Sequence, residues 1–318
     1  MSAPGDERPR LGTVLVPTDF SAEAEKAIVY AQALLREAEG TLHLVYVHEN
    51  DYIYAMPTVL AHPPVPMTEE LEQAEALDLK ELAARCHAGG APAHAHTKTG
   101  RAFDGICQTA AEIGADLIMI STHGNTGLKH LFLGSTTERV VQHAPCPVLV
   151  VREQEREFIA TDPEAPSVHI AKILVPVDFS DCSRSGLQYA LQFAQAHGAS
   201  VVLLHVVQLV PFMPSERFGM YEQMPGPEVL ETAAREQMAK VEQETDFGDV
   251  PREARVVIGR AADEICRGAE QFRADLVIIP THGRTGLAHV LIGSTAEHVV
   301  RYAPCPVLVV PHRENRRS

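Results

Sequence analysis

The apolar positions along the chain form short runs that alternate with stretches of helical spacing. Thr13 to Val16 is a short apolar run ended by Pro17, which predicts a buried strand. From Ser21 to Ala38 the apolar residues recur at helical spacing, and Gly40 follows where such a helix should end. Leu42 to Val47 is again apolar and predicts a second strand.

The same alternation continues through the first half of the chain. After a loop rich in proline and aromatic residues (Asp51 to Pro66), the pattern predicts three helices and three strands. The helices are Thr68–Cys86, Arg101–Ile113 and Ser135–Gln142, and the strands are Ala93–Thr97, Asp116–Ile120 and Val148–Val151. Strands that alternate with helices predict an α/β domain, with a parallel sheet covered by helices on both faces. Ligands of such domains bind outside the carboxyl ends of the strands, where the strand order reverses.

This whole pattern occurs twice. The run Val14–Ser21 returns as Ile173–Ser180, and Ala144–Val151 returns as Ala303–Val310, each 159 residues later. Because the displacement is constant, the halves have equal length and indicate a gene duplication. Between them lies a charged stretch that contains prolines and lacks apolar periodicity. We therefore predict a domain over 1–152, a linker over 153–169 and a second domain over 170–318.

Charge and composition exclude several classes of protein. The net charge of -15 argues against a nucleic-acid partner, because a phosphate backbone needs a basic face. No apolar stretch is long enough to span a bilayer, and Met1 to Arg10 lacks the apolar core of a signal peptide. The six cysteines form no close-spaced pairs, so we expect reduced thiols in a cytoplasmic protein. Because no stretch can span a bilayer, we expect no contact with a membrane.

The candidate ligand-binding segment follows the fourth strand of each half. It runs from Ser121 to Gly127 and then Gly134-Ser135-Thr136 in the first half, and its repeat is Pro280 to Gly286 and then Gly293-Ser294-Thr295. Small residues between a strand and a helix N-terminus expose backbone N–H groups to an anion. The alternative is that the serines begin capping boxes, Ser135-x-x-Glu138 and Ser294-x-x-Glu297, and only start helices.

A helix N-terminus contributes roughly 0.3–1 kcal/mol to anion binding, whereas micromolar affinity needs roughly 8 kcal/mol. A phosphate would therefore bind here only as part of a larger ligand whose remainder fills an apolar pocket.

Two further residue types allow two interpretations each. Asp19 and Asp178 follow the first strand of each half, where a carboxylate can accept hydrogen bonds from a base or ribose, or can cap the next helix. His123 and His282 lie inside the loop, where a histidine is more often structural than a base or ligand.

Signals for catalysis and for metal binding are weak. His94 and His96 lie near Cys86 and His87, but the second half has no matching group, so we predict no protein-ligated metal. The chain contains no Walker A sequence, no G-x-S-x-G elbow and no pair of carboxylates beside the loop. We therefore assign no catalytic residue.

Four motifs follow one another along the chain: the Val-Pro-Thr-Asp-Phe-Ser start, the Thr-His-Gly loop, Gly-Ser-Thr-x-Glu and the Ala-Pro-Cys-Pro-Val-Leu-Val-Val ending. In this order they resemble the universal stress protein family. The resemblance covers nearly the whole chain, twice over. It implies two tandem Rossmann-like (adenine nucleotide alpha hydrolase-like) domains, each with a five-stranded parallel sheet of order 3-2-1-4-5. It also implies a stress-response or signalling role, with a nucleotide-independent interaction module and a slow ATPase as alternatives.

One branch of that family binds ATP through G-x2-G-x9-G-[ST]. The second and third glycines match Gly124 and Gly134 in the first half, and Gly283 and Gly293 in the second. The first glycine is replaced by Ser121 and by Pro280, and proline has no N–H and a fixed φ. Arg284 replaces Asn125 and adds a cation. We therefore expect the first half to bind ATP more reliably.

The resemblance thus implies an ATP site, with Mg²⁺ as an accompanying ion, in each half. The implied residues of the first site are Pro17, Thr18, Asp19, Val47, Ser121, His123, Gly124, Asn125, Gly127, Gly134, Ser135 and Thr136. Those of the second are Pro176, Val177, Asp178, Val206, Pro280, His282, Gly283, Arg284, Gly286, Gly293, Ser294 and Thr295.

The last strand of each half carries a second implication. Val148–Val151 and Val307–Val310 are apolar and would lie at a sheet edge, which invites strand pairing. Family members commonly dimerise through this strand, so the resemblance implies an internal pseudo-dimer, with a homodimer of chains as a further option.

Overall fold

The computed structural model describes residues 11–49, 69–122, 133–152, 155–160, 167–209, 226–281, 283 and 292–311. The chain divides into two compact units. Among the described residues, the first unit takes in those of Arg10–Gln154 and Ile159–Val168, and the second takes in Glu155–Phe158 and those of His169–Ser318.

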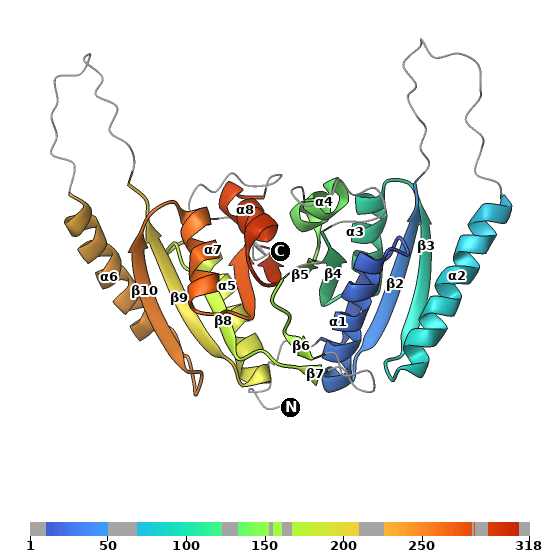
Figure 1. The fold of residues 1–318 in the computed structure, drawn as a ribbon, viewed down its shortest axis with the longest axis horizontal. Helices are drawn as coiled ribbons and strands as arrows, with labels where there is room; N and C mark the ends of the chain where they lie inside the picture. The colour runs from blue at the N-terminus through green and yellow to red at the C-terminus, as the bar shows by residue number, and fades with distance from the viewer. Residues whose placement is uncertain are drawn as a thin grey trace, which may run out of the picture. The chain divides into compact units, whose positions relative to one another are not determined.

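The first unit contains a five-stranded parallel sheet (Figure 1). Its elements in chain order are β1 (Thr13–Pro17), α1 (Ala22–Ala38), β2 (Thr41–His48), α2 (Glu69–Ala88), β3 (Ala93–Thr99), α3 (Ala102–Ile113), β4 (Leu117–Ser121), α4 (Ser135–His143) and β5 (Val148–Val151). The strand order is β3-β2-β1-β4-β5, with every pair parallel. This order confirms the predicted one.

The second unit repeats the arrangement (Figure 1). Its elements are β8 (Lys172–Pro176), α5 (Asp181–His197), β9 (Ser200–Val207), α6 (Pro227–Glu244), β10 (Arg252–Ile258), α7 (Ala261–Gln271), β11 (Leu276–Pro280), α8 (Ser294–Tyr302) and β12 (Val307–Val310). The strand order β10-β9-β8-β11-β12 is also parallel throughout and confirms the prediction.

The stretch that joins the repeats is partly structured. β6 (Ile159–Ala160) and β7 (Ser167–Val168) pair antiparallel, and β7 contacts α1 in the first unit. Before them, the backbone N–H of Arg156 donates to the carbonyl of Pro304, at 2.8 Å, in the second unit. The predicted linker is therefore attached to the units through hydrogen bonds and packing.

Helices cover both faces of each sheet. In the first unit α3 contacts α4, while Gln32 and Arg36 of α1 donate to backbone carbonyls at the end of α2. Right-handed crossovers then place α1 and α2 on one face and α3 and α4 on the other. The central strands are accordingly apolar on both sides, and Leu15 and Leu174 are completely buried.

The predicted end of the first helix differs slightly from the observed one, and the predicted start of the second helix cannot be compared with the structure. Helix α1 ends at Ala38, its C-cap is Glu39 with a left-handed φ of 53°, and Gly40 follows this cap. A Cβ at Gly40 would lie 2.3 Å from the carbonyl oxygen of Leu11, so close backbone approach explains the glycine. The predicted start at Thr68 and the loop Asp51–Pro66 lie outside the described residues.

Candidate functional site

A cavity of about 650 Å³ lies in the second unit, at the carboxyl ends of its strands. Its wall is formed by the ends of β8, β9 and β11 together with residues of α6, α7 and α8. The strand order reverses between β8 and β11, which is the place where ligands of such sheets bind. The predicted residues that line this cavity are Pro176, Val177, Asp178, Val206, Pro280, Gly283, Gly293, Ser294 and Thr295.

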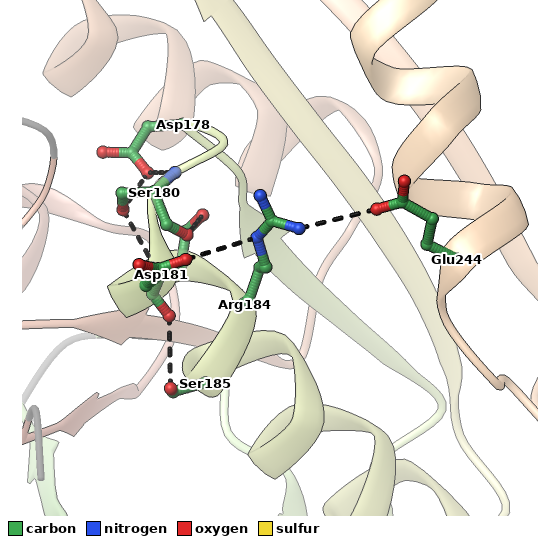
Figure 2. Close-up of polar contacts among 7 residues, drawn as sticks. Asp178, Ser180, Asp181, Arg184, Ser185 and Glu244 are labelled. Carbon is green, nitrogen blue, oxygen red and sulfur yellow. Dashed lines mark hydrogen bonds and ion pairs between the residues drawn. The ribbon is translucent and has the colours of Figure 1, made fainter. Parts of the chain in front are cut away.

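Asp178 contributes a carboxylate to the wall. Its Oδ1 accepts hydrogen bonds from the backbone N–H of Ser180 at 3.0 Å and from its hydroxyl at 2.5 Å. Figure 2 shows that Arg184 instead approaches Asp181 and Glu244, at 3.7 and 3.5 Å. The nearest basic side chain on α5 is therefore directed to other carboxylates, and the hydrogen bonds from Ser180 hold Asp178 at the cavity.

The N-cap alternative for the aspartates is wrong. Ser180, two residues after Asp178, is the N-cap of α5 and accepts from the N–H of Ser183. Ser21 has the same role in α1, and its hydroxyl donates to Asp19. Each aspartate thus orients the capping serine and does not cap the helix itself.

Two glycines that follow β11, Gly283 and Gly293, lie at the wall of the cavity. A Cβ at Gly283 would lie 2.5 Å from Oδ2 of Asp178, so a side chain at 283 would displace this carboxylate. The N–H of Gly293 donates to the carbonyl of Thr281 at 2.9 Å, which fixes the entry to α8.

Helix α8 begins without a side-chain cap. Gly293 is the N-cap, and Ser294 is the first helical residue. Gly134 and Ser135 have the same places in α4. The capping-box alternative is therefore wrong for both helices, because the serine is one position too late. The first-turn N–H groups of a helix lack intrahelical partners and can meet an anion.

Another part of the wall is apolar and aromatic. Leu230 and Ala234 of α6 line it together with Val207 of β9. The His205 ring stacks on Phe179, with centroids 4.2 Å apart, and its Nδ1 lies 2.6 Å from the carbonyl oxygen of Val177. The cavity thus joins a helix N-terminus, a carboxylate and an apolar surface.

The first unit repeats the backbone of this site. Thr18 and Val177 donate their N–H groups to the neighbouring strand at 3.0 and 2.9 Å, and Gly134 donates to the Thr122 carbonyl at 2.9 Å. Phe20 and Phe179 both adopt a left-handed φ, of 62° and 66°. Val47 packs against α3, since a Cβ at Gly105 would lie 2.9 Å from its Cγ2. Pro17 and Ser121 are the last residues of β1 and β4, as Pro176 and Pro280 are of β8 and β11. Asp19 and Asp178 each lie two residues beyond their strand.

The side chains of the first unit differ at the positions that correspond to the apolar and aromatic part of the second unit's cavity wall. Tyr46 donates to Oε1 of Glu75 at 2.9 Å, and Nδ1 of His48 lies 2.6 Å from Oε2 of the same carboxylate. The loop motifs of the sequence do not include these residues, because Tyr46 and His48 lie on β2 and Glu75 lies on α2. A position-by-position comparison of the repeats finds them, since Glu75 aligns with Ala234.

Part of the predicted loop lies outside the described residues. This holds for His123, Gly124, Asn125 and Gly127 in the first half and for His282, Arg284 and Gly286 in the second. Of the first-half residues that remain, Thr136 belongs to the first turn of α4, and Gly134 precedes it.

No metal-binding group is found among the residues that the structure describes, counting clusters of three or more His, Cys, Asp or Glu side chains. His94 and His96 instead contact His43: the His43–His96 ring nitrogens lie 2.8 Å apart, and the His43–His94 centroids 5.1 Å apart.

All six cysteines are free thiols. Burial raises the pKa of Cys107 to about 11, with a smaller contribution from Asp104. Burial also raises the pKa of Cys182, close to the second site, and Asp178 and Asp181 raise it further. These thiols are protonated at neutral pH, so neither is an activated nucleophile.

None of the helices in the described ranges is both long and apolar enough to cross a membrane.

Comparison with known proteins agrees with this architecture. The family model described as the universal stress protein family matches residues 11–152 and 169–311. A universal stress protein of Methanocaldococcus jannaschii is 36% identical over 139 residues, which cover 44% of this chain and 81% of that protein. One from Mycobacterium tuberculosis is 26% identical over 306 residues, 93% of this chain and 96% of that protein.

A solved structure has the same fold over almost the whole chain. The universal stress protein of Archaeoglobus fulgidus matches with a TM-score of 0.67 at 19% identity, covering 97% of this chain and 99% of that one. Two matches to the family model, a full-length tandem relative and two sheets of the expected order lead to one conclusion. The chain belongs to the universal stress protein family and contains two copies of its domain.

Proposed function

We propose that this protein binds an adenine nucleotide, ATP with Mg²⁺, and acts as a stress-response or signalling module in the cytoplasm. The observation that carries the proposal is the cavity of the second unit. Its volume of about 650 Å³ lies within the range of roughly 300–1,000 Å³ that is typical of small-molecule sites.

The wall offers what each part of a nucleotide needs. The first turn of α8, at Ser294 and Thr295, supplies N–H groups for phosphate oxygens. Asp178 supplies a hydrogen-bond acceptor for ribose or base. The apolar surface at Leu230 and Ala234 supplies the burial that a helix terminus lacks.

The other parts of the proposal have their own support. Free thiols and a net charge of -15 favour a reducing compartment and a partner other than nucleic acid. The buried, apolar strands β5 and β12 each lie at the end of their unit's strand order, which supports pairing between them as an internal pseudo-dimer.

The test is to denature freshly purified protein, identify any released nucleotide by chromatography, and titrate nucleotide-free protein with ATP and Mg²⁺ by calorimetry. We expect released adenine nucleotide and saturable ATP binding. Gly283→Ala should weaken the affinity at least tenfold, because its Cβ displaces the Asp178 carboxylate.

Ser185→Ala is the matched control, since this exposed serine on α5 bonds only the Asp181 carbonyl among the contacts shown in Figure 2. Absence of released nucleotide together with absence of ATP-induced thermal stabilisation would favour a nucleotide-independent interaction module. Phosphate release that requires Asp178 would add ATP hydrolysis to the function.

A further inference from the structure

We propose that Glu75, held in place by Tyr46 and His48, excludes nucleotides from the site of the first unit, so that each chain binds a single nucleotide in the second unit. The proposal rests on the nucleotide binding proposed above and concerns which of the two sites is used.

The three residues occupy positions whose repeats line the cavity of the second unit. Moving 159 residues along the chain relates Tyr46 to His205, His48 to Val207 and Glu75 to Ala234. His205, Val207 and Ala234 all belong to the cavity wall. The first unit therefore has a carboxylate at a place where the second unit has only a methyl group.

Glu75 is held by contacts on both of its oxygens. Oε1 accepts the Tyr46 hydroxyl hydrogen at 2.9 Å, and Oε2 lies 2.6 Å from Nδ1 of His48. The imidazole is only 4% exposed, and the edge of its ring meets the Tyr46 ring with centroids 4.9 Å apart. A base that displaced Glu75 would break the hydrogen bond from Tyr46 and the close contact between the carboxylate and the buried imidazole.

Phe20 extends the cluster. Its ring lies 5.1 Å from that of Tyr46. In the second unit, the corresponding Phe179 stacks on His205, whose Nδ1 is directed to the Val177 carbonyl. The aromatic pair is thus repeated, but only in the first unit does it end in a hydroxyl that binds a carboxylate.

Charge adds to the steric argument. Three wall residues of the second cavity are neutral where the first unit has carboxylates: Gln208, Ala234 and Gln237 correspond to Glu49, Glu75 and Asp78. A nucleoside triphosphate carries several negative charges, and these are repelled by carboxylates in a partly buried site.

The pKa of the Tyr46 hydroxyl reflects burial and the negative charge of nearby carboxylates. Its pKa is raised to about 12, first by burial, then by the hydrogen bond and charge of Glu75, with Asp19 and Glu49 adding to the effect. Several carboxylates therefore act on one point of the first site.

The opposite order of the two sites was expected from Ser121 and Pro280. Pro280 is part of the cavity wall, however, and the cavity exists beside it. A missing N–H removes one contact, whereas a fixed carboxylate occupies the volume that a ligand needs. The side chains therefore favour the second site.

The test is the stoichiometry of ATP binding to nucleotide-stripped full-length protein, measured by calorimetry. We expect one ATP per wild-type chain. The variant Tyr46→His/His48→Val/Glu75→Ala copies the wall of the second unit and should bind two, the additional site having a Kd within about tenfold of the first. The reciprocal variant Ala234→Glu should weaken the wild-type site more than tenfold.

The outcomes separate the two proposals. No ATP bound by the wild type would refute the proposed function itself. Two equal sites in the wild type, or an Ala234→Glu variant with wild-type affinity, would overturn the single-site proposal and leave nucleotide binding intact. Should the triple variant not fold, Glu75→Ala alone removes both the charge and the volume of this side chain. It must then gain measurable binding at a second site, and unchanged stoichiometry would count against the proposal.

Discussion

The two units of this protein have the same backbone around their candidate sites and different side chains on the walls. In both, a serine caps the helix after the first strand, an aspartate holds that serine, and a phenylalanine adopts a left-handed φ. In the second unit these features surround a cavity with apolar and neutral polar residues. In the first unit, Tyr46, His48 and Glu75 form a polar cluster at the corresponding positions.

The difference teaches that duplication preserved the scaffold more strictly than the ligand-binding surface. Hydrogen bonds that position the strand ends and helix starts recur with nearly identical lengths, such as 2.9 Å from Gly134 to Thr122 and from Gly293 to Thr281. The wall positions of His205, Val207 and Ala234 hold other residues in the first unit, although the strand order is the same. Substitutions in the scaffold should therefore affect both units equally, and substitutions in the wall should not.

The largest expected effect concerns the scaffold. Leu15 and Leu174 are equivalent, completely buried residues of the central strands. Replacing either with alanine should lower the stability of its own unit by about 2–5 kcal/mol, because a cavity replaces a buried side chain. Native-state hydrogen exchange, followed by mass spectrometry, measures the opening free energy of each unit. Losses that differ by more than about 2 kcal/mol would show that the two cores are not equivalent.

A smaller effect should distinguish the two sites. Asp178→Asn should weaken ATP binding about 10- to 100-fold, which corresponds to the roughly 1.5–3 kcal/mol of a hydrogen bond to a charged group. Asp19→Asn should change the affinity less than twofold if the first site is empty. Both variants weaken a bond to a capping serine, so their effects on thermal stability should be similar. An equal loss of affinity in the two variants would contradict the difference between the units.

Much of the fold could be predicted because the pattern of strands and helices occurs twice in the sequence. Buried parallel strands read as apolar runs such as Val14–Val16, and the constant displacement of the repeat placed every strand of the second unit. Local capping was less predictable. Asp19, Ser21 and Ser135 are all suitable N-cap residues, and only the backbone geometry selects Ser21 and leaves α4 to begin at Gly134.

The binding site was predictable only in part. Loop residues such as Gly283 and Gly293 were found because the segment occurs in both halves and its spacing matches G-x2-G-x9-G-[ST]. The other wall was missed, since Ala234 belongs to an ordinary amphipathic helix and meets β9 only after folding. The contact between Glu75 and His48 likewise joins α2 to β2 and follows from no local motif.

The smallest expected effect concerns pH and again divides the units. His43 of β2 contacts His94 and His96 of β3. Burial, followed by the charges of His96 and His94, lowers the pKa of His43 to about 4 from 6.5. The pKa of His96 is also lowered, by burial first and then by His94 and Lys98, while Glu112 opposes this shift. In the second unit the positions of the three histidines hold Val202, Glu253 and Arg255.

The direction in which stability changes with pH follows from proton binding at His43. The unfolded chain takes up a proton at His43 below about pH 6.5, whereas the folded chain resists protonation until about pH 4. The stabilisation is therefore complete above pH 6.5 and is lost as the pH falls towards 4. The full shift would correspond to about 3 kcal/mol, but His43 is only half-buried, so solvent screening should reduce the loss to about 1–2 kcal/mol.

His43→Val, which copies Val202, should remove this part of the pH dependence. The measurement is the opening free energy of β2 amides by hydrogen exchange at pH 7.5 and pH 5, with the amides of β9 as the internal reference. Wild-type protein should lose stability in β2 and retain it in β9 over this interval, and the variant should behave alike in both strands. A wild-type β2 that is as insensitive to pH as β9 would mean that the histidine cluster exerts no strain on the first unit, and that the two scaffolds respond to acid in the same way.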